Sequence, residues 1–416
     1  MSGPAAPRPA PLGWSAWLLA GAATLTMAVS YFDRQTLASL APKVTADLGI
    51  SNEQYGWLVS AFSVAYLVGS PLSGRFVDRF GGRRVLLGAV LVWTIVAALH
   101  ARASGFVMLL ALRVALGFAE SPSFPGAVQT VHRALPLESR ARGVGLLFTG
   151  SSIGALIAPL ATSAIEHRAG WRYAFLVTAF AGLVWVPMWL LVTSRPSARA
   201  ALDVDVQDAS QPTAPKTPFL EVLKNPAVLR AAIVVLASAP MVGFVLNWSA
   251  KYLTAVEGIA QADMGRYLWV PPLLFDIGSV AFGHFASIHV SRHRKLPSHL
   301  FILAACLAST LPLLLVVHGP YARMAVAGVA IGGVAGLFAM FTSDMISRVP
   351  RGAVSAAGGI TAAAQSLVYI IANPIVGKVV DSTHSYSGPI VGLALPVIPG
   401  VLVFLAWRLP KPSLEL

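Results

Sequence analysis

The sequence predicts an all-α membrane protein with twelve transmembrane helices, arranged as two pseudo-symmetric six-helix bundles. Composition gives the first reason: 56% of the 416 residues are hydrophobic and 11% are charged, against about 25% charged residues in an average soluble domain. A soluble chain of this length needs more charge to cover its surface, whereas a bilayer-facing surface needs none. The recurrence and grouping of the apolar stretches give the second and third reasons. This composition does not fit a soluble enzyme.

Six apolar stretches form the first set, each close to the ~20 residues that cross the hydrocarbon core. The chain starts with a Pro-rich segment, and the apolar run from Trp14 has no small-residue cleavage site. We therefore interpret this run as a retained span and not as a signal peptide. The first six predicted spans cover residues 14–40, 52–75, 84–101, 103–128, 141–165 and 172–194.

A polar segment, Ser194–Pro226, separates the two sets and is rich in Pro, Ser and Ala. Its composition predicts a linker with room for a short surface helix. The six spans that follow cover residues 227–254, 264–288, 297–317, 320–346, 353–378 and 386–408. The predicted division is thus an N-terminal six-helix bundle (1–194), a cytoplasmic linker (195–226) and a C-terminal six-helix bundle (227–416).

Two related halves around a central site are common among transporters, and this chain contains a weak internal sequence repeat. Gly74-x-x-x-Asp78 precedes a basic pair after the second span, and Gly283-x-x-x-Ser287 precedes basic residues after the eighth. The second copy departs from the first because Ser287 stands where the acid is expected.

Basic residues predict the orientation of the chain. With a cytoplasmic N-terminus, 20 of the 30 Lys and Arg residues fall in inside segments and 8 fall outside. This asymmetry matches the positive-inside rule, so the net charge of +13 sets topology and does not indicate a nucleic-acid partner. We expect a multi-pass protein of the cell (inner) membrane with both termini cytoplasmic, working as a monomer within the lipid bilayer.

Neither a metal nor a cofactor is expected from the residue types present. The single cysteine, Cys306, excludes a disulfide framework and a thiolate metal site. The nine histidines lack metal-ligand spacing, and there is no Gly-rich phosphate loop or nucleophile elbow.

The loop that follows the second span carries the most specific short motif. Its sequence, Gly-Arg-Phe-Val-Asp-Arg-Phe-Gly-Gly-Arg-Arg over residues 74–84, resembles the signature of the major facilitator superfamily. We expect Gly74 to permit close helix approach and Asp78 to accept hydrogen bonds from a helix N-terminus and a neighbouring Arg. The predicted conformational latch therefore comprises Gly74, Asp78, Arg79, Arg83 and Arg84; a solvated basic turn is the alternative.

Further motifs resemble one branch of that superfamily, the anion:cation symporters. These motifs include Tyr31-Phe32-Asp33-Arg34, Arg113-x-x-x-Gly117-x-x-Glu120, Glu138-Ser139-Arg140-Ala141, Gly170-Trp171-Arg172, Phe275-Asp276-Ile277-Gly278 and Asn373-Pro374-Ile375-Val376-Gly377. The branch includes bacterial hexuronate and galactonate transporters, sialin and the vesicular glutamate transporters. The resemblance covers nearly the whole chain, is stronger in the first half, and implies the major facilitator fold.

Ionisable side chains inside predicted spans are the candidate functional residues, because each costs about 2.5–3.5 kcal/mol at mid-bilayer and therefore usually faces a cavity. They are Asp33, Arg34, Arg113, Glu120 and Asp276. Three acids outnumber two arginines, and burial favours the neutral form of a carboxyl group. At least one acid is therefore expected to hold a proton near neutral pH.

Each charged candidate receives a predicted role. Arg34 binds the substrate carboxylate, because a guanidinium grips it through two hydrogen bonds. Asp33 and Glu120 carry protons, and Arg113, seven residues before Glu120 and roughly 10 Å away along the helix, influences the proton on Glu120. The resemblance implies substrate and proton roles at these same positions. Asp276 joins the proton-coupling set, with a role in helix packing left open; structural pairing is likewise the alternative for Asp33, Arg34 and Arg113.

Uncharged polar side chains complete the predicted substrate site. Tyr31 and Tyr66 lie at positions compatible with a cavity and are able to bond a hydroxylated substrate, although interior tyrosines often serve packing. Asn247 and Gln365 are the candidates from the second half.

The sequence thus predicts a secondary active transporter that couples a small organic anion, a sugar acid or other carboxylate, to protons by alternating access. Sodium remains an alternative coupling ion. A monocarboxylate or aromatic-acid carrier, a drug or metabolite efflux antiporter, and a transporter-like sensor or receptor are the competing interpretations.

Overall fold

A computed structural model of the chain describes residues 14–202, 218–293, 296–350 and 353–409. Within these ranges the chain is helical and has no strand, and 12 helical segments are long and apolar enough to cross a membrane. Both the all-α class and the twelve predicted spans are confirmed.

Seven helices form the N-terminal half. Ser51 caps α2, because its hydroxyl accepts from the backbone N–H of Gln54 while the Gln54 side chain accepts from the Ser51 N–H. The chain then reverses at Gly81 and Gly170, whose φ angles of 80° and 83° favour glycine. The helices are α1 (Trp14–Asp47), α2 (Asn52–Phe80), α3 (Gly82–Leu99), α4 (Phe106–Glu120), α5 (Ser123–Ala134), α6 (Leu137–Ala169) and α7 (Trp171–Thr193).

The linker contains two short helices, α8 (Pro196–Leu202) and α9 (Phe219–Lys224), consistent with the expected surface helix. Its three aspartates, Asp203, Asp205 and Asp208, lie outside the described residues.

The C-terminal half also has six spans, several of them broken at prolines. Pro271 and Pro272 follow the break between α11 and α12, and Pro396 separates α16 from α17, since proline supplies no N–H to the preceding turn. Its helices are α10 (Pro226–Glu257), α11 (Gly265–Leu268), α12 (Val270–His293), α13 (Ser298–Ala308), α14 (Pro320–Ile346), α15 (Val354–Thr383), α16 (Ser387–Ala394) and α17 (Val397–Ala406), with 3₁₀ turns η1 (His100–Arg102), η3 (Gln261–Asp263) and η4 (Leu311–Leu315).

The two halves meet along symmetry-related pairs of helices. α2 packs against α15, α6 packs against α11 and α12, and α1 packs against α10. Small residues permit these approaches: a Cβ on Gly56 would lie 2.3 Å from the carbonyl oxygen of Asn373, and one on Gly377 would lie 2.2 Å from that of Asn52. Substitution at either glycine would therefore force the halves apart.

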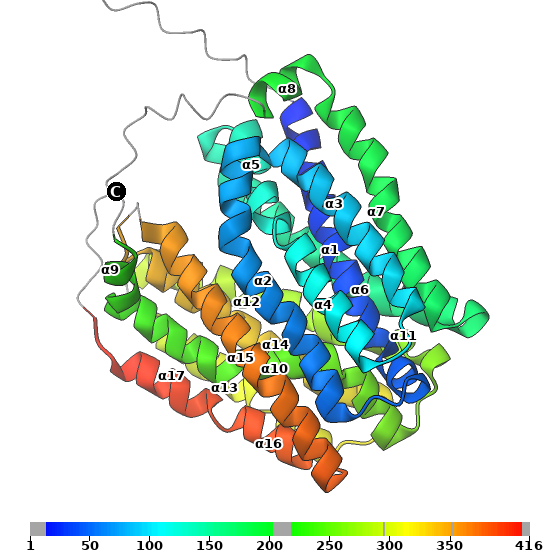
Figure 1. Ribbon diagram of the computed structural model, residues 1–416. Coiled ribbons are helices and arrows are strands. Elements are labelled where there is room, and N and C mark those ends of the chain that lie inside the picture. Colours follow the sequence, from blue (N-terminus) through cyan, green and yellow to red (C-terminus); the bar gives the residue numbers. More distant parts are fainter. Residues whose placement is uncertain (1–13, 203–217, 294–295, 351–352, 410–416) are drawn as a thin grey trace, which may run out of the picture.

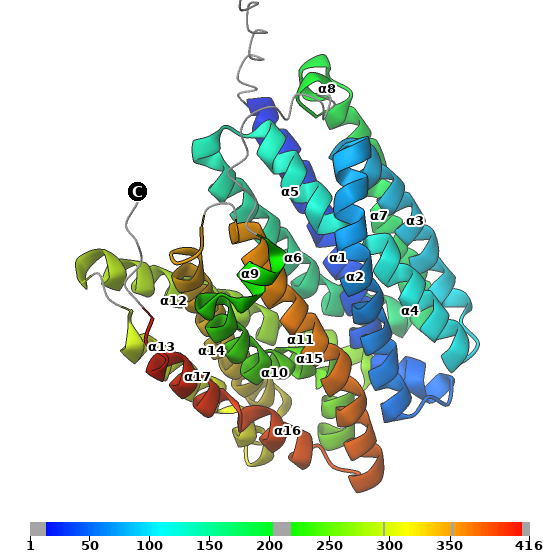
Figure 2. The same cartoon turned by 60° about the vertical axis from the view of Figure 1, so that its left-hand side comes forward.

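Hydrogen bonds between the halves gather at one end of the molecule, the end where α2 begins and α15 finishes, which we call the closed end. The ribbons of α2 and α15 converge there and diverge toward the end that carries α8 and α9 (Figures 1 and 2). Within the described ranges, the bonds that join the halves come from the closed end or from the middle of the spans, through Ser39, Thr45, Asn52, Glu53, Tyr55, Ser60 and Ser152. The halves are therefore joined at the closed end.

Candidate functional site

A break in the fourth span positions Glu120. α4 ends at Glu120 and α5 begins at Ser123, because Pro122 cannot donate to the carbonyl of Phe118. The hydroxyl and the backbone N–H of Ser121 both donate to that carbonyl, at 2.8 and 3.3 Å, and so replace the donor that proline lacks. The predicted span 103–128 is thus two helices, and the carboxyl group of Glu120 lies at their junction.

Glu120 is fully buried and is held by two residues of α1. Its Oε2 accepts from the Ser30 hydroxyl at 2.7 Å and from Nε of Arg34 at 2.7 Å. Ser30 and Arg34 are one helical turn apart and therefore share a face. The charge that pairs with Glu120 is Arg34. Among the described residues Arg113 forms no ion pair, in line with the expected distance between it and Glu120, and its influence on the proton of Glu120 stays a prediction.

Aromatic rings surround the guanidinium of Arg34. Its Cζ lies 4.4 Å from the Tyr66 ring centroid, 4.9 Å from that of Tyr31 and 5.0 Å from that of Phe62. These are cation–π distances, and such contacts fix the guanidinium in place. The Arg34 side chain is 16% exposed, while Oε1 of Glu120 and one terminal nitrogen of Arg34 are buried with no hydrogen-bond partner among the described residues. The pair therefore retains unused hydrogen-bonding capacity.

Phe62 also connects Arg113 to this cluster. The Arg113 Cζ lies 4.6 Å from the Phe62 centroid, and its Nε donates to the carbonyl of Leu58 at 3.3 Å. Arg113 is 4% exposed. Two guanidinium groups therefore contact one ring, and only one of them is paired with a carboxylate.

Asp33 is buried beside the cluster without a partner. It is 4% exposed, and neither of its carboxyl oxygens has a hydrogen-bond partner among the described residues. Because successive residues of a helix point about 100° apart, Asp33 and Arg34 face different directions. Asp33 is thus a buried carboxyl group that Arg34 does not compensate.

The remaining predicted site residues form hydrogen bonds elsewhere. Asp276 of α12 accepts from the Ser152 hydroxyl of α6 at 2.7 Å and so joins the two halves. Asn247 donates to the carbonyl of Gly243, and Gln365 donates to the hydroxyl of Tyr369, each within its own helix. Within the described ranges, no hydrogen bond links these three residues to the Arg34–Glu120 pair.

The predicted latch does not show the expected helix contact at Gly74. Among the described residues, no heavy atom lies within 4 Å of a Cβ built on Gly74, so the expected close helix approach there is wrong for this conformation. Gly74 lies toward the end where α2 and α15 diverge, which accounts for the open space. The side chain of Asp78 lies outside the described residues; Arg79 and Arg84 are exposed and Arg83 is half-buried.

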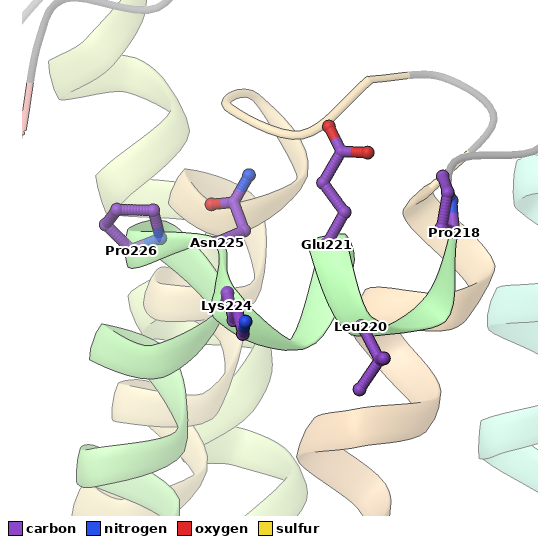
Figure 3. Close-up of a pocket in the computed structure, with 6 residues that line it drawn as sticks. All are labelled: Pro218, Leu220, Glu221, Lys224, Asn225 and Pro226. Carbon is purple, nitrogen blue, oxygen red and sulfur yellow. The ribbon is translucent and has the colours of Figure 1, made fainter.

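One hollow lies away from this cluster. It lies on the linker, has a volume of about 570 Å³, and is lined by Pro218, Leu220, Glu221, Lys224, Asn225 and Pro226 (Figure 3). The Glu221 side chain points away from Leu220 and Lys224, so the close-up shows no converging polar groups. Its open, superficial form does not suit a buried ligand.

Ser30 and Phe62 are the two site residues that the sequence analysis missed. Ser30 stands four residues before Arg34, and this spacing places its hydroxyl on the same face; that signal was available. The contact of Phe62 with both arginines depends on how α2 crosses α1 and α4, which no spacing within one helix reveals.

Comparison with known proteins identifies the family. The family model described as Major Facilitator Superfamily matches residues 23–373. A hexuronate transporter of Bacillus subtilis (strain 168) is 27% identical over 399 residues, covering 92% of this chain and 93% of that protein. A hexuronate transporter of Escherichia coli (strain K12) is 26% identical over 419 residues, covering 96% and 95%.

The fold is also shared with a solved structure. A bacterial homologue of the human lysosomal transporter Spinster, in an inward-facing and unoccupied conformation, superposes with a TM-score of 0.77 at 16% identity, covering 95% of this chain and 97% of that one. At this identity the likeness concerns the fold alone.

Proposed function

We propose that this chain, which belongs to the Major Facilitator Superfamily, carries a sugar acid or a related carboxylate together with protons by alternating access. It is a membrane transporter and not an enzyme. The substrate class is supported by relatives named as hexuronate transporters. The observation that carries the proposal is the buried Arg34–Glu120 pair, in which a guanidinium suited to a carboxylate is held by a titratable acid.

Arg34 is the proposed anchor for the substrate carboxylate. Its side chain remains partly exposed, and one terminal nitrogen has no partner within the described ranges. An incoming carboxylate is able to form the bidentate contact that guanidinium groups favour and thereby competes with Glu120. Tyr31 and Tyr66 hold the guanidinium in position, and Asn247 and Gln365 are the proposed contributors from the other half.

Glu120 and Asp33 are the proposed proton carriers. When substrate takes over Arg34, Glu120 loses its counter-charge in a dry environment, and binding a proton removes the cost of a buried negative charge. Asp33 has no partner for either oxygen among the described residues, and a buried carboxyl in that position is stabler neutral than ionised. Arg113, which contacts the same Phe62 ring as Arg34, is a further positive charge near these acids. Asp276 is a further candidate proton carrier.

Two acids bear on the energetics of accumulation. One proton moving with a monoanion transfers no net charge and draws only on the pH gradient. A second proton adds one net charge, worth about 2.3 kcal/mol per 100 mV, or roughly a fifty-fold gradient. Two carriers therefore permit accumulation driven by the membrane potential.

The proposed orientation places the closed end outside the cell. The end with α8 and α9 carries the predicted basic inside segments, so the positive-inside rule assigns it to the cytoplasm, as it does both termini. The conformation described is then inward-facing. In this orientation the proposed latch at residues 74–84 would form only when the cytoplasmic ends approach each other. We propose the cell inner membrane as the location and a monomer as the working unit.

The test is uptake of radiolabelled D-glucuronate by purified protein in proteoliposomes with an imposed pH gradient, acidic outside. We expect accumulation above the equilibrium level, abolished by a protonophore and by Arg34→Ala. Sodium replaced by potassium should leave uptake unchanged. Uptake that is insensitive to the pH gradient, or retained in Arg34→Ala, would refute the proposed symport.

A further inference from the structure

Lys251 is a half-buried cation at the closed end that the proposed mechanism does not use. It lies on α10, and its Nζ donates to the Thr45 hydroxyl of α1 at 2.8 Å. The Nζ also lies 5.4 Å from the ring centroid of Tyr55 of α2. Among the described residues, no carboxylate lies within 4 Å of it. Lys251 therefore contacts the opposite half through neutral groups only.

An ammonium group in this position is costly if its only task is to hold the halves together. Asp381 of α15 is the nearby carboxylate, but it lies more than 4 Å from the ammonium and accepts from Asn52 and Glu53 instead. It therefore offsets only part of the several kcal/mol that removing a charge from water costs. Thr45 already donates its proton to the carbonyl of Ala41, at 2.8 Å, and so does not need Lys251. Tyr55 joins the halves with a neutral group, because its hydroxyl donates to the carbonyl of Asn247 at 2.7 Å. The charge of Lys251 thus points to a task in another state of the carrier.

The position of Lys251 relates it to the proposed substrate path. It is four residues after Asn247, so the two side chains share one face of α10. Its partner Thr45 is eleven residues after Arg34 on the continuous helix α1, which corresponds to about 16 Å along the axis. Lys251 therefore lies on the closed-end side of Arg34, at the junction of α1, α2 and α10.

We propose that Lys251 is an anion-docking residue at the outer mouth of the transport path, which binds the substrate carboxylate before Arg34 does. This inference rests on the proposed function and orientation. When the closed end opens, α1 and α2 separate from α10, and the ammonium loses Thr45 and Tyr55. A cation freed within a narrow mouth concentrates anions there.

Closure of the outer end would then cover the ammonium of Lys251 again. The Thr45 hydroxyl and the Tyr55 ring return to the ammonium and occupy the space beside it. These neutral contacts cover the ammonium in the closed state. The carboxylate is then left to the guanidinium of Arg34. Substrate therefore passes inward, from Lys251 to the deeper guanidinium.

Initial uptake of D-glucuronate from the outside, measured against concentration in cells that lack a hexuronate carrier of their own, tests this inference. The variants are Lys251→Gln, which removes the charge, Lys251→Arg, which keeps it, and Thr45→Val, which leaves the charge and removes the hydroxyl that contacts it in the closed state. We expect Lys251→Gln to raise KM about tenfold and to keep kcat within about twofold. A tenfold change is the lower end of the increase in local anion concentration that electrostatic focusing produces. Lys251→Arg and Thr45→Val should keep KM within about twofold.

Ionic strength supplies a second measurement that needs no variant. Raising external salt from about 20 to 200 mM shortens the screening length, and it should raise KM of the unmodified protein severalfold. An unchanged KM in Lys251→Gln, a Thr45→Val variant that reproduces Lys251→Gln, or a KM insensitive to salt would each overturn the inference alone. Failure of the unmodified protein to take up D-glucuronate would instead overturn the proposed function together with it.

Discussion

Asp381 fastens the closed end, and replacing it should open that end. The carboxylate lies near the end of α15 and accepts three hydrogen bonds from the start of α2. Its Oδ1 accepts from the backbone N–H and the side-chain amide of Asn52, at 3.1 and 2.7 Å, and Oδ2 accepts from the backbone N–H of Glu53 at 2.8 Å. One acid of the C-terminal half thus caps a helix of the N-terminal half.

Asp381→Asn retains an acceptor for Asn52 but presents an amide N–H₂ to the N–H of Glu53. The substitution loses one charge-assisted bond, worth about 1.5–3 kcal/mol, and the attraction of a negative charge to a helix N-terminus, about 0.3–1 kcal/mol. Because Asp381 is half-buried, we take the lower part of this range, about 2 kcal/mol. At 1.4 kcal/mol per factor of ten, the fraction of molecules whose closed end is open should rise roughly thirtyfold.

Labelling of a cysteine behind the closed end measures this change. Ser39 is 2% exposed and lines a small hollow between the halves, so Ser39→Cys in a Cys306→Ser background reports opening to an impermeant maleimide added outside. Asp47→Asn is the matched control, because Asp47 is an acid at the same end that accepts from Trp171 within the N-terminal half. Labelling that Asp381→Asn leaves unchanged, or that Asp47→Asn accelerates equally, would refute the reasoning.

Three further outcomes follow from the described contacts. Arg34→Lys keeps the charge but loses the planar fork, so uptake should fall about 10–100-fold for a lost contact of 1.5–3 kcal/mol; uptake kinetics within twofold of the unmodified protein would contradict this role. Gly154→Ala places a Cβ 2.2 Å from a carbonyl oxygen of α1 and should destabilise the protein by about 1–3 kcal/mol in thermal unfolding. Gly145→Ala is the control, because its Cβ meets no described atom within 4 Å, and it should leave the stability unchanged. Arg323→Met removes the ion-pair partner of Glu257 and should cost about 2–4 kcal/mol, lowering the melting temperature by several degrees while leaving the KM for substrate unchanged; an altered KM would place Arg323 in the transport path.

Hydropathy predicts the number of spans well and their ends less well, for physical reasons. The first span was expected to end at residue 40, yet α1 continues to Asp47. Its last turns are stabilised by the Lys43–Asp47 pair, at 3.0 Å, and by packing of Val44. The charged pair lowers the hydropathy of this stretch although it stabilises the helix. The break after Glu120 is missed for the opposite reason, because the stretch 106–134 is apolar on average although Glu120, Ser121 and Ser123 flank Pro122.

Charge inside the spans indicates candidate residues, but it does not indicate how they pair. Spacing along α4 relates Arg113 to Glu120 only within one helix. The partner chosen by Glu120 depends on how close α1 comes to α4, and that distance follows from packing between helices. The two adjacent residues Asp33 and Arg34 illustrate the same limit, since one is paired and the other has no partner among the described residues.

Substrate accumulation by Glu120→Gln tests the central claim most directly. The glutamine oxygen is able to accept from Ser30 and Arg34, but its amide neither binds nor releases a proton between pH 5 and 9. In proteoliposomes with an acidic exterior, the unmodified protein should concentrate D-glucuronate, and the variant should exchange labelled for unlabelled D-glucuronate without concentrating it. A Glu120→Gln protein that still concentrates D-glucuronate along the pH gradient would contradict the account.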